Sequence, residues 1–102
     1  MSMTKWVPES DPKILRRVGK TGEEAAELSK VCSRITVQGI DGVDPKTGVP
    51  NRQALMEELA DVQAQIGCCV LAFDLDQEYI ALRTARKMDQ MAEWEAMFDP
   101  GS

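Results

Sequence analysis

Two segments of strongly helical sequence each place a pair of acids beside a regular series of apolar residues. The pairs are Glu24 with Glu27 and Glu58 with Asp61. Residues three apart lie on one face of a helix with their Cβ atoms roughly 5–6 Å apart, so each pair presents two carboxylates to one point. If the two helices pack together, the pairs can converge and hold a hard divalent cation.

The apolar residues beside the acids recur at alternating spacings of four and three residues in both segments. Every acid of a pair directly precedes one member of the series. The first series is Ile14, Val18, Ala25, Leu28, Cys32 and Ile35, with Thr21 filling its gap, and the second is Leu55, Leu59, Val62, Ile66, Cys69 and Phe73. This spacing predicts two helices that pack antiparallel across a shared core, with the acids at its flank.

The first helix is predicted over about residues 12–38, because Asp11 is a suitable N-cap for it. Gly19 and Gly22 weaken the middle of this helix, and a bend or a break there remains open. Residues 1–10, which precede the helix, are predicted to form a loosely ordered arm.

Two further helices follow from the cap signals, and the predicted fold class is therefore all-α. Asn51 is predicted to cap a helix that reaches about Asp74, and Asp76 a third that runs to about Met97. Residues 39–50, the only long connection, are rich in turn-forming residues. A role as lid or substrate-recognition loop and a role as plain connector both remain open.

The third predicted helix combines an apolar face with a cluster of cations. Its apolar face consists of Tyr79, Leu82, Ala85, Met88, Met91 and Ala92. Arg83, Arg86 and Lys87 lie within about one and a half turns of one another. They are either solvated surface charges or contacts for phosphate oxygens, to which arginine offers a bidentate fork and lysine a point charge.

The length of 102 residues predicts a single domain over residues 1–102. Three helices with long apolar faces cannot cover one another completely in a monomer. We therefore expect a helical bundle that is completed by homo-oligomerisation, with a dimer as the smallest assembly. The net charge of −5 disfavours a general binding surface for nucleic acid polymers or anionic membranes.

Several residue types constrain the location and the chemistry. The sequence contains no apolar run long enough to span a membrane and no signal-peptide stretch, so we expect a cytoplasmic protein. The cysteines at 32, 68 and 69 lie in predicted helices, which is typical of core thiols in a reducing compartment. Histidine is absent, which excludes histidine-dependent hydrolases and leaves oxygen ligands that suit Mg²⁺ or Mn²⁺.

The acid pairs also have a plain interpretation. Acidic residues make up 17 of the 102 positions, so acids on helix flanks are frequent in this composition. They can be solvated, or they can form ion pairs with Lys20, Lys30 and Arg52. Spacing alone leaves both the metal site and this alternative open.

Two motifs resemble those of a known family. The sequence Glu-Glu-Ala-Ala-Glu at 23–27, followed after a long gap by Glu-Leu-Ala-Asp at 58–61, resembles the Glu-Glu-x-x-Glu and Glu-x-x-Asp motifs of MazG-like all-α nucleoside triphosphate pyrophosphohydrolases. The lead-in at 18–24 is also similar. The resemblance extends from about Leu15 to Met88 and is strongest to small single-domain members from phages and bacteria.

The resemblance implies hydrolysis of a nucleoside triphosphate to a monophosphate and pyrophosphate, with Mg²⁺ or Mn²⁺ as cofactor. It implies that Glu24, Glu27, Glu58 and Asp61 are both the metal ligands and catalytic residues. Glu23 occupies the first acidic position of the motif, where it orients water or a metal ligand, or is a surface residue. Members of the family form dimers or tetramers with the nucleotide site at or near the subunit interface.

Five residues are candidates for substrate binding: Lys20, Asn51, Arg52, Arg83 and Lys87. In many relatives, a lysine of the third helix is followed by an asparagine and a basic residue. Lys87 matches this lysine, but no asparagine follows it at the corresponding position. The connection between the two motifs is also an elaborated, turn-rich loop, so the nucleobase preference of better-known relatives is not transferred.

Two other functions remain open. The chain can be a non-enzymatic helical homodimer that serves as an interaction or regulatory module, with acids that are solvated or hold a structural cation. Alternatively, the fold is retained but the substrate is a phosphoribosyl nucleotide. Nucleotide-pool control is the expected role if the family resemblance holds.

Overall fold

The computed structural model describes residue 3 and residues 5–99, and this part of the chain is all-helical. Its helices are α1 (Pro12–Gln38), α2 (Asn51–Ala72) and α3 (Gln77–Ala96). Within the described residues, β-pairing is limited to one isolated antiparallel bridge, between Val43 and Pro50. The predicted all-α fold class and the order of the three helices are confirmed.

The start and the end of α1 follow from local signals. Asp11 caps the helix, since its Oδ1 accepts a hydrogen bond of 2.8 Å from the backbone nitrogen of Lys13. The helix continues through Gly19 and Gly22 without a break, because packing along a long helix outweighs a cost of about 1 kcal/mol per glycine. At Gly39, where φ is 88°, the backbone leaves the helix.

The prediction that Asn51 caps α2 is wrong. Pro50 occupies the N-cap position, and Asn51 is the first residue of the helix. The Asn51 side chain is fully buried. Its Nδ2 donates to Oε1 of Gln38 at 3.1 Å and to the carbonyl oxygen of Gly39 at 3.0 Å. The amide therefore joins the end of α1 to the start of α2 instead of closing its own helix.

The connection at residues 39–50 is held to both helices by ion pairs. Arg34 of α1 lies 3.5 Å from Asp44, and Arg52 of α2 donates to Asp41 at 3.1 Å. Within the connection, the backbone nitrogen of Asp44 donates to the carbonyl oxygen of Val49 at 3.0 Å. These contacts favour the plain connector over a mobile lid.

Replacing Asn51 with alanine is expected to lower the free energy of unfolding by about 1–3 kcal/mol, because the buried amide no longer donates to Gln38 and Gly39 and no longer joins the two helices. Urea unfolding followed by circular dichroism measures this loss. Gln53→Ala, at an exposed position of the same helix, is the matched control and is expected to change little. Equal effects of the two substitutions would contradict the assigned role of Asn51.

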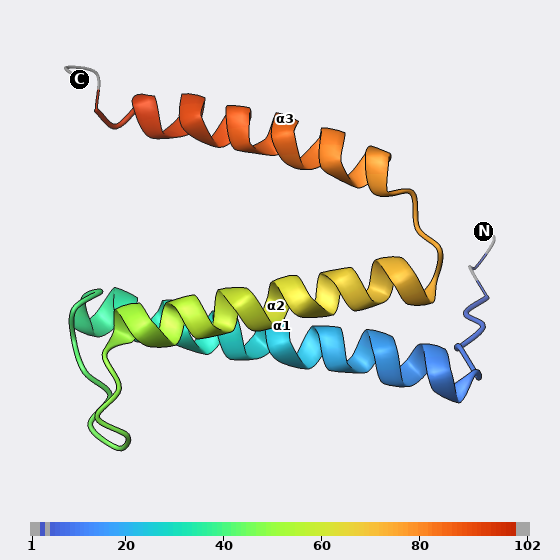
Figure 1. Ribbon diagram of the computed structural model, residues 1–102, viewed down its shortest axis with the longest axis horizontal. Helices are drawn as coiled ribbons and strands as arrows, with labels where there is room; N and C mark the ends of the chain where they lie inside the picture. The colour runs from blue at the N-terminus through green and yellow to red at the C-terminus, as the bar shows by residue number, and fades with distance from the viewer. Residues whose placement is uncertain (1–2, 4, 100–102) are drawn as a thin grey trace.

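The three helices do not enclose a common core. α1 and α2 lie side by side and antiparallel, whereas α3 turns back at the end of α2 and runs apart from both (Figure 1). Among the described residues, only α1 and α2 pack against each other over an extended length. The Cα radius of gyration is 18.1 Å, against about 13 Å for a compact domain of this length.

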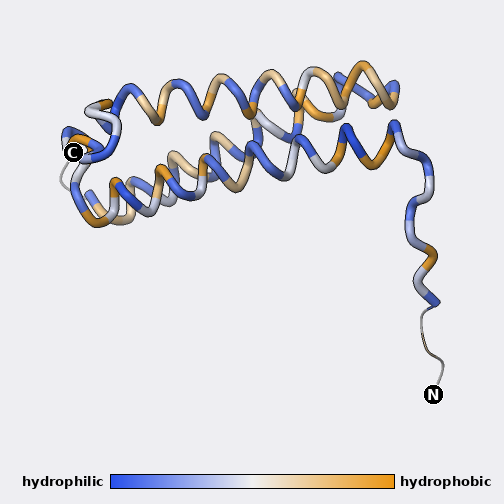
Figure 2. The backbone as a smooth tube through the Cα atoms, turned by 90° about the horizontal axis from the view of Figure 1, so that it is seen from below, coloured by the Kyte–Doolittle hydropathy of each residue, from blue (hydrophilic) through white to orange (hydrophobic). Residues whose placement is uncertain are grey.

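Few apolar side chains are shielded from water in this arrangement. Val31, at 6% exposure, is the one buried hydrophobic residue in the described part. Hydrophobic positions recur along all three helices between hydrophilic ones (Figure 2). On α3, Leu82 and Met88 are 62% and 68% exposed. The predicted apolar face of α3 is therefore uncovered in the single chain.

The expected core thiols are only partly found. Cys32 and Cys68 are exposed, and all three cysteines are free. Cys69 is half-buried, with its Sγ atom 3.1 Å from Oγ1 of Thr21. The expectation of a core thiol is wrong for Cys32 and Cys68 in the single chain, because α3 does not pack along α1 and α2.

None of the helices in the described part combines the length and the apolar character that crossing a bilayer requires.

Candidate metal centre

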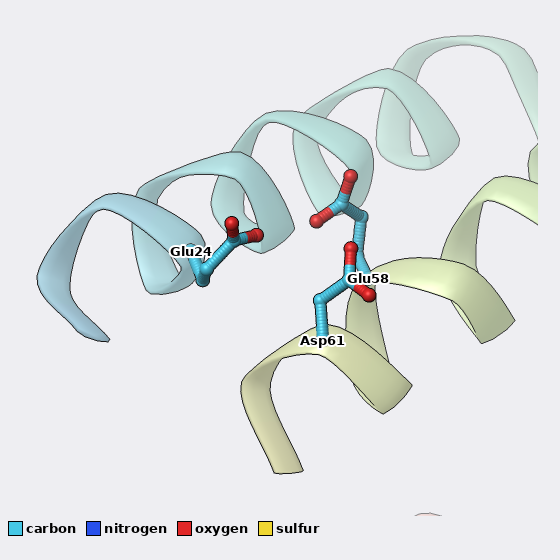
Figure 3. A group of neighbouring side chains, drawn as sticks. All are labelled: Glu24, Glu58 and Asp61. Carbon is cyan, nitrogen blue, oxygen red and sulfur yellow. The ribbon is translucent and has the colours of Figure 1, made fainter. Parts of the chain in front are cut away.

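The antiparallel packing of α1 and α2 brings three of the predicted acids together. Glu24 extends from α1 toward Glu58 and Asp61, which are one turn apart on α2 (Figure 3). Each residue contributes one carboxylate oxygen to a group in which these oxygens all lie within 4.8 Å of one another. Oxygens at such separations can ligate one divalent cation. We call these three residues the acid group.

Glu58 is the most constrained member of the acid group. It is half-buried, and its Oε2 atom is buried without a hydrogen-bond partner. Burial raises the pKa of Glu58 above its ordinary value of 4.5, and the negative charges of Asp61, Glu24, Glu27 and Glu57 raise it further, in that order. A buried carboxylate without a donor, among other carboxylates, is unfavourable unless a proton or a cation compensates it.

Glu27 and Glu23 lie outside the acid group. Glu27 accepts a hydrogen bond of 3.1 Å from Lys30, although its charge still raises the pKa of Glu58. The side chain of Glu23 is 63% exposed and lies 3.5 Å from the Lys20 ammonium. The charge of Glu27 thus acts on the acid group although Glu27 is not part of it, while Glu23 faces solvent.

Two of the ion pairs in the plain interpretation are present. Lys20 lies 3.6 Å from Glu24, and the pKa of Lys20 is raised by Glu23 first and by Glu24 second. Lys30 pairs with Glu27. Arg52, in contrast, pairs with Asp41 and with none of the predicted ligands. Pairs as exposed as these contribute little to stability.

The substrate-binding candidates are spread over the molecule. Asn51 and Arg52 lie at the connection between α1 and α2, where Asn51 is enclosed by the chain itself. Arg83 and Lys87 line an apolar cleft of about 600 Å³ along α3, together with Tyr79. Arg83 and Lys87 form no ion pair within the described residues. In the single chain, α3 runs apart from α1 and α2, the helices that carry the acid group (Figure 1).

Sequence reasoning missed a basic cleft of about 720 Å³ between the start of α1 and the end of α2. The cations Lys13, Arg16, Arg17 and Lys20 line it. A usable signal was present, since spacings of three, four and seven residues place these side chains on one face of a helix. The prediction included only Lys20 as a candidate for substrate binding.

Comparison with known proteins does not assign the chain to a family. No family model, curated protein or solved structure matches it. The acid group, the buried oxygen of Glu58 and the cations nearby are therefore the structural indications of function.

Proposed function

We propose that the chain is a Mg²⁺-dependent, MazG-like nucleoside triphosphate pyrophosphohydrolase. It converts a ribo- or deoxynucleoside triphosphate into the monophosphate and pyrophosphate, and its role is control of a nucleotide pool in the cytoplasm. The observation that carries this proposal is the unpartnered, buried oxygen of Glu58 beside Glu24 and Asp61. A carboxylate in such surroundings suits a cation ligand better than a solvated surface charge.

The donor set fits a hard cation. Glu24, Glu58 and Asp61 offer only oxygen atoms, which Mg²⁺ and Mn²⁺ prefer. Glu27 is the fourth proposed ligand, since its charge already acts on Glu58. When bound, the cation neutralises phosphate charge and favours ionisation of water at neutral pH.

The proposed reaction is a displacement at the α-phosphorus. The oxygen of a water molecule forms a bond to this phosphorus, and the bond from the phosphorus to the oxygen that bridges to the β-phosphate breaks. The products are the monophosphate, which gains the water oxygen, and pyrophosphate, while one proton is released. Orientation of the water is the role that we assign to Glu23, whose exposed side chain lies beside Lys20.

The exposed apolar surface supports a homo-oligomer, either a dimer or a tetramer. The chain exposes 8619 Å², whereas a compact monomer of its 11.3 kDa mass exposes about 5,700 Å². The excess of about 2,900 Å² per chain, doubled for two copies, reaches the upper end of the total area that obligate interfaces bury. In such an assembly, α3 of one copy packs against another copy, and Arg83 and Lys87 are then available to the phosphates of the substrate.

A panel of ribo- and deoxynucleoside triphosphates, with a phosphoribosyl nucleotide included, tests the proposed reaction. Each compound is incubated with the protein and Mg²⁺, Mn²⁺ or chelator, and monophosphate and pyrophosphate are quantified. The expected result is release of both products in equal amounts, only with metal. Orthophosphate release, or no release from any compound, would overturn the proposal.

A non-enzymatic helical homodimer is the second candidate, and the uncovered apolar face of α3 favours it. In that case the acids are solvated or hold a structural cation. Asp61→Asn distinguishes the two functions, since it abolishes activity in the enzyme and changes at most the stability of an interaction module.

A further inference from the structure

The basic cleft between the start of α1 and the end of α2 concentrates positive charge in an acidic chain. Its cations are Lys13, Arg16, Arg17 and Lys20, against one carboxylate, that of Asp11. Asp11 is engaged in capping α1. Within the described residues, no carboxylate forms an ion pair with the first three cations of this set.

The cleft is built from both helices. Arg17 is half-buried, and its Nη1 atom donates to Oε1 of Gln65 on α2 at 3.1 Å. This hydrogen bond holds the guanidinium against α2 and leaves its other N–H groups free to donate. Phe73, just beyond the end of α2, contributes an apolar wall. The arginine is therefore held in place before a ligand arrives.

Lys20 connects the cleft to the acid group along α1. Lys20 lines the cleft and also lies 3.6 Å from Glu24. Arg17 and Glu24 are seven residues apart, which corresponds to about 10 Å along the helix axis. A single ligand with several linked phosphates can therefore contact the cations with one end while its other end lies at the acids.

We propose that this cleft binds the terminal phosphates of a polyphosphate ligand, and that during the reaction it holds the β- and γ-phosphates that leave as pyrophosphate. This inference rests on the proposed function for the identity of the substrate, but not for the binding of polyphosphate itself. Arginine forks and lysine ammonium groups stabilise phosphate oxygens through charge-assisted hydrogen bonds.

Isothermal titration of inorganic tripolyphosphate into the full chain with chelator present tests the cleft without metal. The Lys13→Gln/Arg16→Gln variant is expected to weaken binding at least about 10-fold. The control is Lys30→Gln/Lys46→Gln, which removes the same charge at positions outside the cleft and is expected to change binding less than about 2-fold. Equal weakening in both variants, or no binding to the wild type, would overturn the proposal.

Further measurements distinguish failure of the cleft from failure of the proposed reaction. Single Arg16→Gln, at an exposed position, replaces the double variant if circular dichroism shows that the latter is unfolded. Nucleoside triphosphates are expected to displace tripolyphosphate, and nucleoside monophosphates are not. If nucleoside mono- and triphosphates displaced tripolyphosphate at equal concentrations, the proposal would be overturned.

Failure of the reaction gives a different pattern. Suppose that tripolyphosphate binding depends on the cleft but no compound of the substrate panel releases pyrophosphate. This result would support phosphate binding by the cleft and refute the proposed reaction. Metal-dependent pyrophosphate release with an unchanged KM in the cleft variant would refute phosphate binding by the cleft and support the proposed reaction. An increase in KM of about 10-fold is the result expected if both hold.

Discussion

Replacing Glu58 with glutamine is expected to reduce pyrophosphate release at least about 100-fold without destabilising the metal-free protein. The substitution keeps the size of the side chain but removes the charge that would ligate the cation. It also removes like-charge repulsion with Asp61 and Glu24. The free energy of unfolding in chelator is therefore expected to stay the same or to rise by a few tenths of a kcal/mol.

The same substitution is expected to alter the pH dependence of stability. In the metal-free protein the pKa of Glu58 is raised above 4.5, so the folded state binds a proton at this group more tightly than the unfolded state does. Its contribution to stability is present below pH 4.5 and is lost as the pH rises through the pKa of the folded state. Wild type should therefore lose stability relative to Glu58→Gln between acid and neutral pH, and divalent metal should restore it.

Glu57→Gln is the matched control for these measurements. Glu57 is exposed, precedes Glu58 in the same helix and accepts a hydrogen bond from Gln53. Urea unfolding from pH 4.5 to 7.5 in chelator, together with pyrophosphate release at neutral pH with Mg²⁺, compares the two variants. Full activity of Glu58→Gln, or equal losses in both variants, would contradict the assignment of Glu58 as a ligand.

Charging the apolar face of α3 is expected to dissociate the proposed oligomer. Leu82→Lys/Met88→Lys removes two large side chains that the single chain leaves exposed. Burial of each of these side chains in an interface stabilises it by about 1.5–3 kcal/mol. Because both copies of a dimer lose these contacts, the dissociation constant is expected to rise at least about 1000-fold, with a large fall in melting temperature.

Sedimentation velocity over a range of protein concentrations measures the change in assembly. Gln77→Lys/Gln90→Lys adds the same charge at polar positions of α3 and is expected to leave the assembly nearly unchanged. A wild-type chain that sediments as a monomer at high concentration would contradict the proposed oligomer. Equal dissociation of both variants would show an effect of charge alone.

Local signals account for the features that the sequence predicted correctly. The Asp11 side chain reaches the backbone of Lys13 two residues away, and the four-three spacing of apolar residues acts within one helix. The three helices of the described part therefore begin and end within two residues of their predicted bounds. The spacing also allowed Glu24 to meet Glu58 and Asp61, because equivalent positions beside two packed apolar series can converge. It did not show that Glu27, at the fourth equivalent position, stays outside the acid group.

Contacts between residues distant in sequence determined the rest. Asn51 suits an N-cap by residue type, yet its amide is bound by the end of α1, which propensity does not reveal. The buried Oε2 of Glu58, the Arg17 to Gln65 hydrogen bond and the basic cleft exist only where α1 lies against α2.

The sequence by itself thus determined the helices, the caps of α1 and α3 and the acidic residues beside the apolar faces, because hydrogen bonds and periodicity along a helix depend on near neighbours. Only the tertiary structure decided which acid is desolvated, which cations share a cleft and that α3 stays uncovered in the single chain. Desolvation and charge clustering depend on the distances between helices, and no spacing along one helix specifies those distances.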